Sequence, residues 1–103
     1  MSLMPRIDIA RVNELGAGYA TEGWHHHGAH HLHGYIVSGR LQLEYVLEGR
    51  EIVDLNSGDF FHVPPRLTHR DINPNKDREL LVVNTLVGTG PAVVNVDSPV
   101  KGD

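Results

Sequence analysis

The sequence contains no cysteine. This absence excludes a disulfide scaffold, a thiolate zinc finger, a cysteine-ligated iron–sulfur site and a cysteine nucleophile. No apolar run approaches the roughly 20 residues of a transmembrane helix. The N-terminus also lacks the basic and then apolar pattern of a signal peptide, so we expect a cytoplasmic protein with no membrane partner.

Positive charge is scarce as well. Lysine and arginine together number 9 against 13 acidic residues, which gives a net charge of −4 with histidine neutral. A nucleic-acid or anionic-membrane surface would be basic, so neither is expected as a partner. The 103 residues suit one domain of about 100–150 residues. We expect a single domain over residues 1–103, with its core between about 6 and 96 and loose tails at both ends.

Helical periodicity is also missing, since no long stretch has apolar residues at i, i+3, i+4 and i+7. The 11 glycines and 6 prolines divide the chain into short pieces rich in Val, Ile, Leu, Tyr and Phe, which favour strands. Turn signals recur roughly every 8–12 residues, as in all-β folds. We therefore predict an antiparallel sandwich or small barrel of the jelly-roll type. The expected strands are 6–12, 17–21, 23–27, 31–37, 40–47, 51–55, 60–63, 67–72, 79–86 and 91–96.

Histidine, by contrast, is abundant. Six of the eight histidines lie between His25 and His33. On a strand, His25 and His27 point to the same face and could bind one divalent cation together. A turn at Gly28 could then return His31 or His33 toward the same ion. A solvated, metal-free histidine loop is the alternative, because a histidine-rich tract is only a compositional hint of metal binding.

A second group of residues follows Gly58, in the segment Gly58-Asp-Phe-Phe-His-Val-Pro-Pro-Arg66-Leu-Thr-His69-Arg-Asp-Ile-Asn73. Together the two segments resemble the cupin superfamily, with motifs G-x5-H-x-H-x3-4-E-x6-G and G-x5-P-x-G-x2-H-x3-N. The second motif fits except that Arg66 replaces a glycine. In the first, His25 and His27 supply H-x-H and Gly39 supplies the closing glycine, while the opening glycine is not matched.

The glutamate of the first motif is missing. The longer spacer, and the count back from Gly39, both point to Leu32, which has no donor atom, whereas the shorter spacer points to His31. We expect His31 to be the fourth ligand, with His33 as the alternative and a strand bulge absorbing the extra residue. The resemblance then implies a metal site of His25, His27, His31 and His69.

The resemblance implies a jelly-roll β-barrel (double-stranded β-helix) that holds one divalent transition metal, and Zn, Ni, Fe, Cu and Mn all remain open. It further implies a metal-dependent enzyme of the dioxygenase, isomerase or decarboxylase type, acting on a small organic substrate and often dimeric. A non-catalytic metal-binding or sensor module is the alternative, because this fold hosts many functions.

Several other residues are candidates for the pocket or the core. Arg66 either binds an anionic substrate or faces solvent. Glu44 and Tyr45 are expected on the sheet surface or on a dimer face. His62 lies on the strand before the second motif and could face the site. His33, His62, Trp24, Tyr35 and Arg66 are the candidate substrate or pocket residues, and the aromatic residues Trp24, Tyr35, Phe60 and Phe61 are expected in the core or pocket wall.

Overall fold

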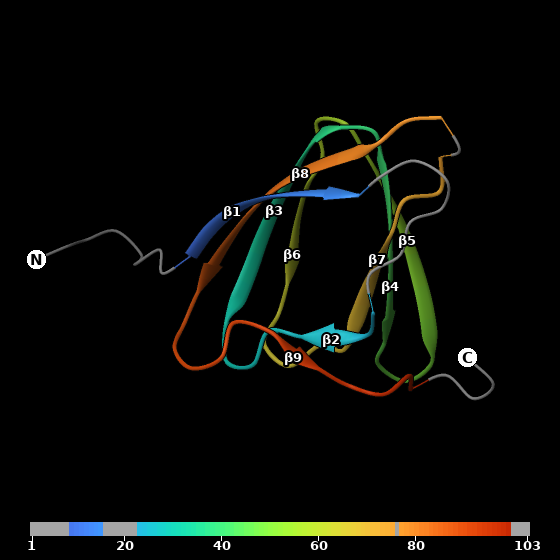
Figure 1. Ribbon diagram of the computed structural model, residues 1–103. Coiled ribbons are helices and arrows are strands. Elements are labelled where there is room, and N and C mark those ends of the chain that lie inside the picture. Colours follow the sequence, from blue (N-terminus) through green and yellow to red (C-terminus); the bar gives the residue numbers. More distant parts are fainter. Residues whose placement is uncertain (1–8, 16–22, 76, 100–103) are drawn as a thin grey trace, which may run out of the picture.

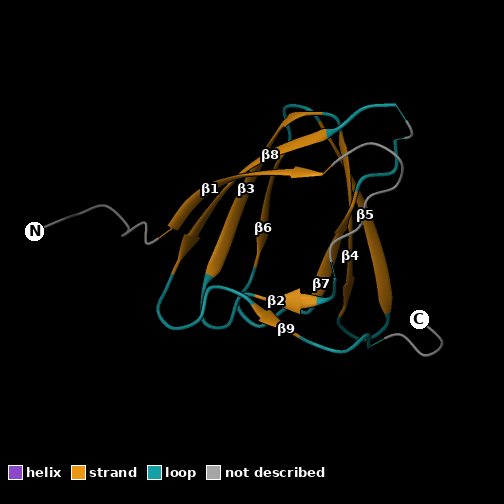
Figure 2. Cartoon of the chain, viewed as in Figure 1, coloured by secondary structure: helices purple, strands orange, loops and turns teal. Residues whose placement is uncertain are grey.

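The computed structural model describes residues 9–15, 23–75 and 77–99. All regular structure in these ranges is β-strand (Figure 2), as the scarcity of helical periodicity predicted. No helix in the described part of the chain has the length and apolarity to span a membrane. The expected strand at 17–21 lies outside the described residues.

The strands form two antiparallel sheets that face each other (Figure 1). The four-stranded sheet, sheet A, has the order β1-β8-β3-β6, and the five-stranded sheet, sheet B, has the order β5-β4-β7-β2-β9. Consecutive strands thus alternate between the sheets for much of the chain, as in a jelly roll. The strands are β1 (Ile9–Leu15), β2 (His25–His26), β3 (His31–Ser38), β4 (Arg40–Val46), β5 (Arg50–Asn56), β6 (Phe60–Val63), β7 (His69–Ile72), β8 (Leu80–Val87) and β9 (Val94–Asn95).

The core lies between the sheets in two clusters of buried aliphatic side chains. The first comprises Leu32, Leu43, Val63 and Leu86, and the second comprises Ile36, Leu41, Leu80 and Val82. Phe61 packs against both clusters. Because burying one such side chain stabilises the fold by about 1.5–3 kcal/mol, these residues fix the two sheets against each other.

The motif glycines occupy turns that need a positive φ. Gly39, with a φ of 88°, is the single residue between β3 and β4. A Cβ there would lie 2.6 Å from the carbonyl oxygen of Glu79, so no other residue fits without a shift of backbone. Gly58, with a φ of 93°, completes the turn between β5 and β6. Both turns therefore carry the chain from one sheet to the other, from β3 to β4 and from β5 to β6.

Candidate metal centre

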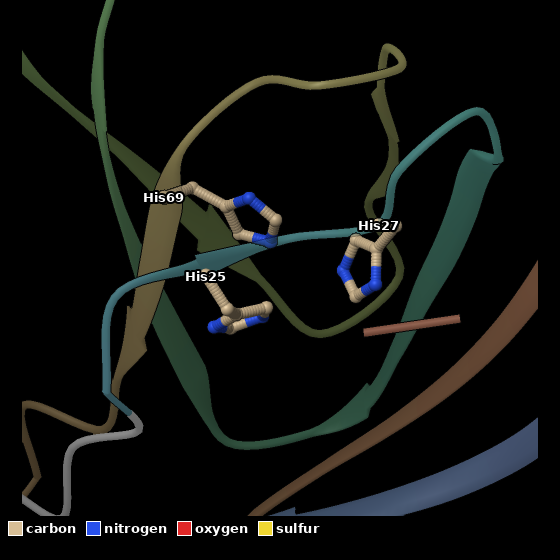
Figure 3. A group of neighbouring side chains, drawn as sticks. All are labelled: His25, His27 and His69. Atoms are coloured by element: carbon tan, nitrogen blue, oxygen red, sulfur yellow. The ribbon is translucent and has the colours of Figure 1, made fainter. Parts of the chain in front are cut away.

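Three buried histidines gather where β2 and β7 pair. His25 on β2 is the direct antiparallel partner of His69 on β7, so their side chains lie on the same face of sheet B. His27 lies two residues after His25 and points to the same side (Figure 3). Their exposed fractions are 5%, 7% and 1% for His25, His27 and His69. We call these three residues the inner histidine cluster.

The spacing of the inner histidine cluster suits a single metal ion. One ring nitrogen from each residue lies within 4.8 Å of the other two, and the ring centroids are 4.4–5.0 Å apart. Imidazole nitrogens bound to one metal at about 2.0–2.1 Å stand about 3 Å or slightly more from each other. Small rotations of the rings would therefore close the cluster around one ion.

Backbone carbonyls fix the orientation of all three rings. Nδ1 of His25 lies 2.7 Å from the carbonyl oxygen of Gly23. Nδ1 of His27 lies 2.8 Å from that of Ala92, and Nδ1 of His69 lies 2.8 Å from that of Leu67. A carbonyl can only accept, so each Nδ1–H donates and each Nε2 carries a lone pair. This tautomer is the one that ligating histidines adopt when an outer hydrogen bond orients them.

Burial also keeps His69 neutral. The pKa of His69 is lowered to about 3, mainly by desolvation. The hydrogen bond to the Leu67 backbone raises this pKa, while repulsion from His25, His27 and His26 contributes to lowering it. Since a metal binds only the neutral imidazole, no proton has to be removed from His69 at neutral pH. The orientation, burial and protonation of the cluster all fit a divalent transition metal.

His31 does not join the inner histidine cluster. It is exposed on β3, whereas the next residue, Leu32, is buried between the sheets. Successive side chains of a strand point to opposite faces, so both residues cannot point inward. The expected bulge does occur, between Ile36 and Ser38, but it comes after both residues and leaves their faces unchanged. Leu32 thus takes the inward place that the motif gives to glutamate, and the placement expected for His31 is corrected.

The alternative ligand, His33, is exposed on the same outer face as His31, and so is His62 of β6. His62 also reaches the rim of the cavity described below. Tyr35 is half-buried on this outer face, with its ring centroid 4.7 Å from that of Phe60. Phe60 itself is 78% exposed and is not a core residue, because β6 is an edge strand and Phe60 points away from the space between the sheets.

Arg66 occupies the turn between β6 and β7, where the motif has glycine. Its φ of 62° is the positive value that glycine adopts without strain. The Arg66 side chain is exposed, and its backbone N–H donates to the carbonyl oxygen of Gly28 at 2.9 Å. This hydrogen bond ties the second motif to the turn after His27.

The other face of sheet B carries an ion-pair group around a buried glutamate that the sequence did not predict. Glu44, expected on the surface, is 0% exposed and accepts hydrogen bonds from Arg50 and from Arg70, the latter at 2.6 Å. The Arg70 guanidinium also stacks 4.8 Å from the centre of the buried Trp24 ring. Trp24 therefore supports the strand that carries His25 from the outside and is not a pocket wall.

Residues of both sheets line an apolar cavity of about 310 Å³. None of the three inner histidines is among its described lining residues, but two lining residues are neighbours of His69. Tyr45, which was expected on the sheet surface, is the direct cross-strand partner of His69, and the Leu67 carbonyl orients His69. The Tyr45 hydroxyl donates to the Glu51 carboxylate, which raises the pKa of Tyr45 above its usual value. The described lining residues are Leu43, Tyr45, Leu47, Val53, Leu55, Phe61, His62, Pro64 and Leu67.

Several solved structures have a similar fold, although their sequence identity to this chain is low. An uncharacterised conserved protein with a double-stranded β-helix domain from Klebsiella pneumoniae has a TM-score of 0.74 at 14% identity, over 93% of this chain and 81% of its own. A recombinant oxalate oxidase in complex with glycolate has a TM-score of 0.69 at 19% identity, over 84% of this chain and 54% of its own. A mutant of Bacillus subtilis oxalate decarboxylase has a TM-score of 0.73 at 18% identity, over 84% of this chain and 23% of its own.

At these identities the likeness concerns the fold alone, and the chain spans about half the length of the oxalate oxidases it matches. No curated protein matches the chain significantly. The family described as "Cupin domain" matches residues 12–85, a range that contains the inner histidine cluster and both turn glycines. The chain therefore belongs to the cupin domain family.

Proposed function

We propose that the chain is a metal-dependent cupin enzyme that acts on a small, largely apolar and uncharged organic substrate. The observation that carries the proposal is the inner histidine cluster with its three fixed rings. One of them, His69, is paired across the ladder with Tyr45, which lines an apolar cavity. His25, His27 and His69 would hold one divalent transition metal. When bound, such a metal supplies Lewis acidity at the coordination positions that the protein leaves open.

The chemistry of the cavity favours an uncharged substrate. Its described lining contains no lysine or arginine to neutralise a carboxylate, and binding an unpaired charge in an apolar site is costly. The Glu51 carboxylate beside Tyr45 adds negative charge near the mouth. A small dianion such as oxalate therefore suits this cavity poorly, although oxalate oxidases share the fold.

Tyr45 is the residue placed to contact the substrate with a polar group. As the direct partner of His69 across the ladder, its Cβ lies about 4.5–5.5 Å from that of His69. Its single O–H donates to Glu51, so the phenol oxygen can accept a hydrogen bond from a substrate hydroxyl. We assign Tyr45 the role of orienting the substrate and holding a proton at its Oη atom.

Metal analysis of protein purified without a tag or a nickel column tests the first part of the proposal. Wild type should retain about one equivalent of a transition metal, and His27→Ala should lose it, because removal of even an outer hydrogen-bond partner of a ligand weakens binding about 10–100-fold. Arg66→Ala, altered in the adjoining turn but not in the cluster, should retain the metal. A wild-type protein that takes up no metal would refute the proposal.

Dioxygen uptake by the metal-loaded protein tests the second part. We expect uptake with neutral aromatic diols or quinols, little with oxalate, and a reduced rate for Tyr45→Phe. Metal binding without turnover of any diol, thiol or quinol would instead favour the non-catalytic binding module. The homodimer implied by the family remains a prediction, which light scattering on the purified protein can check.

A further inference from the structure

A second group of imidazoles lies on the outer face of sheet A. His31 and His33 are two residues apart on β3, and His62 on β6 is the direct cross-strand partner of His33. All three side chains are exposed, and none belongs to the inner histidine cluster. Leu32, which lies between His31 and His33 in the sequence, is buried and points to the opposite side of sheet A. Sheet A therefore separates the two groups of histidines.

Two of the three rings are in direct contact, because Nδ1 of His31 and Nε2 of His62 share a hydrogen bond of 2.9 Å. In this arrangement the two nitrogens face each other, so both exposed rings have to rotate before their lone pairs can point to one ion. The ring centroids of His33 and His62 are 4.8 Å apart, and the three rings lie within 15° of parallel. Because the side chains are exposed, rotation of His33 can bring a third nitrogen to the same point.

We propose that His31, His33 and His62 form a second metal site, which is exposed and independent of the inner histidine cluster. Its all-imidazole donor set suits Zn²⁺, Ni²⁺ or Cu²⁺, whereas Mg²⁺ and Ca²⁺ require oxygen ligands. Water completes the coordination, because only two or three protein donors are available. The exposed ion exchanges with solvent, in contrast to an ion enclosed by the inner histidine cluster.

Zinc titration of the untagged, metal-free protein at pH 7.5 tests this site, with calorimetry for affinity and elemental analysis for stoichiometry. Wild type should bind two Zn²⁺ ions. His62→Ala should weaken one of them at least about tenfold, the lower bound seen for changes around a metal site, and leave the other unchanged. The matched control is Thr85→Ala, the cross-strand partner of His33 on β8, which removes a non-ligating side chain from the same face.

A variant of the inner histidine cluster separates the two sites. His27→Ala should lose the ion that His62→Ala keeps, and keep the ion that His62→Ala weakens. Circular dichroism of His62→Ala, whose change is at the surface, should match wild type. The proposal is overturned if every ion that wild type binds also binds His62→Ala within tenfold of its wild-type affinity.

Discussion

Acid should destabilise the metal-free protein through His69. The pKa of this histidine is about 3 in the folded protein because the ring is desolvated, against 6.5 for the ordinary side chain. Between these two values the unfolded chain binds a proton that the folded chain does not. The contribution of His69 to stability is therefore fully present above pH 6.5 and is lost as the pH falls from there toward 3.

The size of the loss follows from the same two values. One pH unit within this window corresponds to about 1.36 kcal/mol. At pH 4.5, two units below the ordinary pKa, the free energy of unfolding should be lower than at pH 8 by about 2.7 kcal/mol from His69 alone. That is a large share of the roughly 5–15 kcal/mol typical of a domain.

Urea unfolding with a chelator present, followed by fluorescence of the single tryptophan, Trp24, measures the effect. The reference is His69→Asn, whose amide cannot be protonated in this range and can still donate to the Leu67 carbonyl. Carboxylates that titrate near pH 4.5 affect both proteins and cancel in the comparison. If wild type and His69→Asn lose the same free energy between pH 8 and pH 4.5, the reasoning from buried His69 is refuted.

Two substitutions outside the cluster test other parts of the structure, both by urea unfolding at pH 8. Arg66→Gly should raise the free energy of unfolding by about 1 kcal/mol, because it relieves a left-handed backbone conformation that costs other residues roughly 1–2 kcal/mol. An unchanged or lower free energy of unfolding would contradict the positive φ of Arg66. Glu44→Gln should lower the free energy of unfolding by about 2–3 kcal/mol. This is less than the full cost of breaking a buried ion pair, because Arg50 is about half exposed. A decrease of under 1 kcal/mol would contradict the buried pairing of Glu44.

The fold could be predicted because its signals are local. Turn residues such as Gly39 and Gly58 divide the chain at the observed strand ends, and alternation of side chains gives each strand one buried face. That His25 and His69 lie close together was predicted only from the resemblance to the two cupin motifs, because the strands that carry them are far apart in the sequence. No local pattern contains the register that pairs them.

Two of the wrong predictions, those for His31 and Glu44, arose where local rules conflicted or gave no information. His31 was predicted to point toward the metal because it has a donor atom, although the spacing from Gly39 pointed to Leu32. Neighbouring side chains of a strand point to opposite faces, and Leu32 packs in the core, so His31 points outward. Glu44 was assigned to the surface because it lies on the polar face of β4. Its burial depends on Arg50 and Arg70, which reach it from two neighbouring strands, and the sequence does not specify that meeting.

The last prediction concerns Leu32, which occupies the inward place of the missing glutamate. It packs in a cluster with Leu67 and Ala92, whose carbonyls orient His69 and His27. A carboxylate introduced at this position would therefore lie beside the inner histidine cluster. Without metal, Leu32→Glu should be less stable than wild type by several kcal/mol, because an unpaired carboxylate replaces a buried aliphatic side chain.

With metal, the same carboxylate becomes a ligand and its burial is compensated by the charge of the ion. Carboxylate ligands suit Mn²⁺ better than imidazole does, so Leu32→Glu should bind Mn²⁺ at least about tenfold more tightly than wild type, an effect in the range of other changes around metal sites. Thermal unfolding with and without Mn²⁺ measures both effects, because the ion should restore the lost stability. Leu32→Gln, which has the same shape without the charge, is the control. If it gains as much from Mn²⁺ as Leu32→Glu does, then Leu32 does not face the metal and the assignment of the fourth position is wrong.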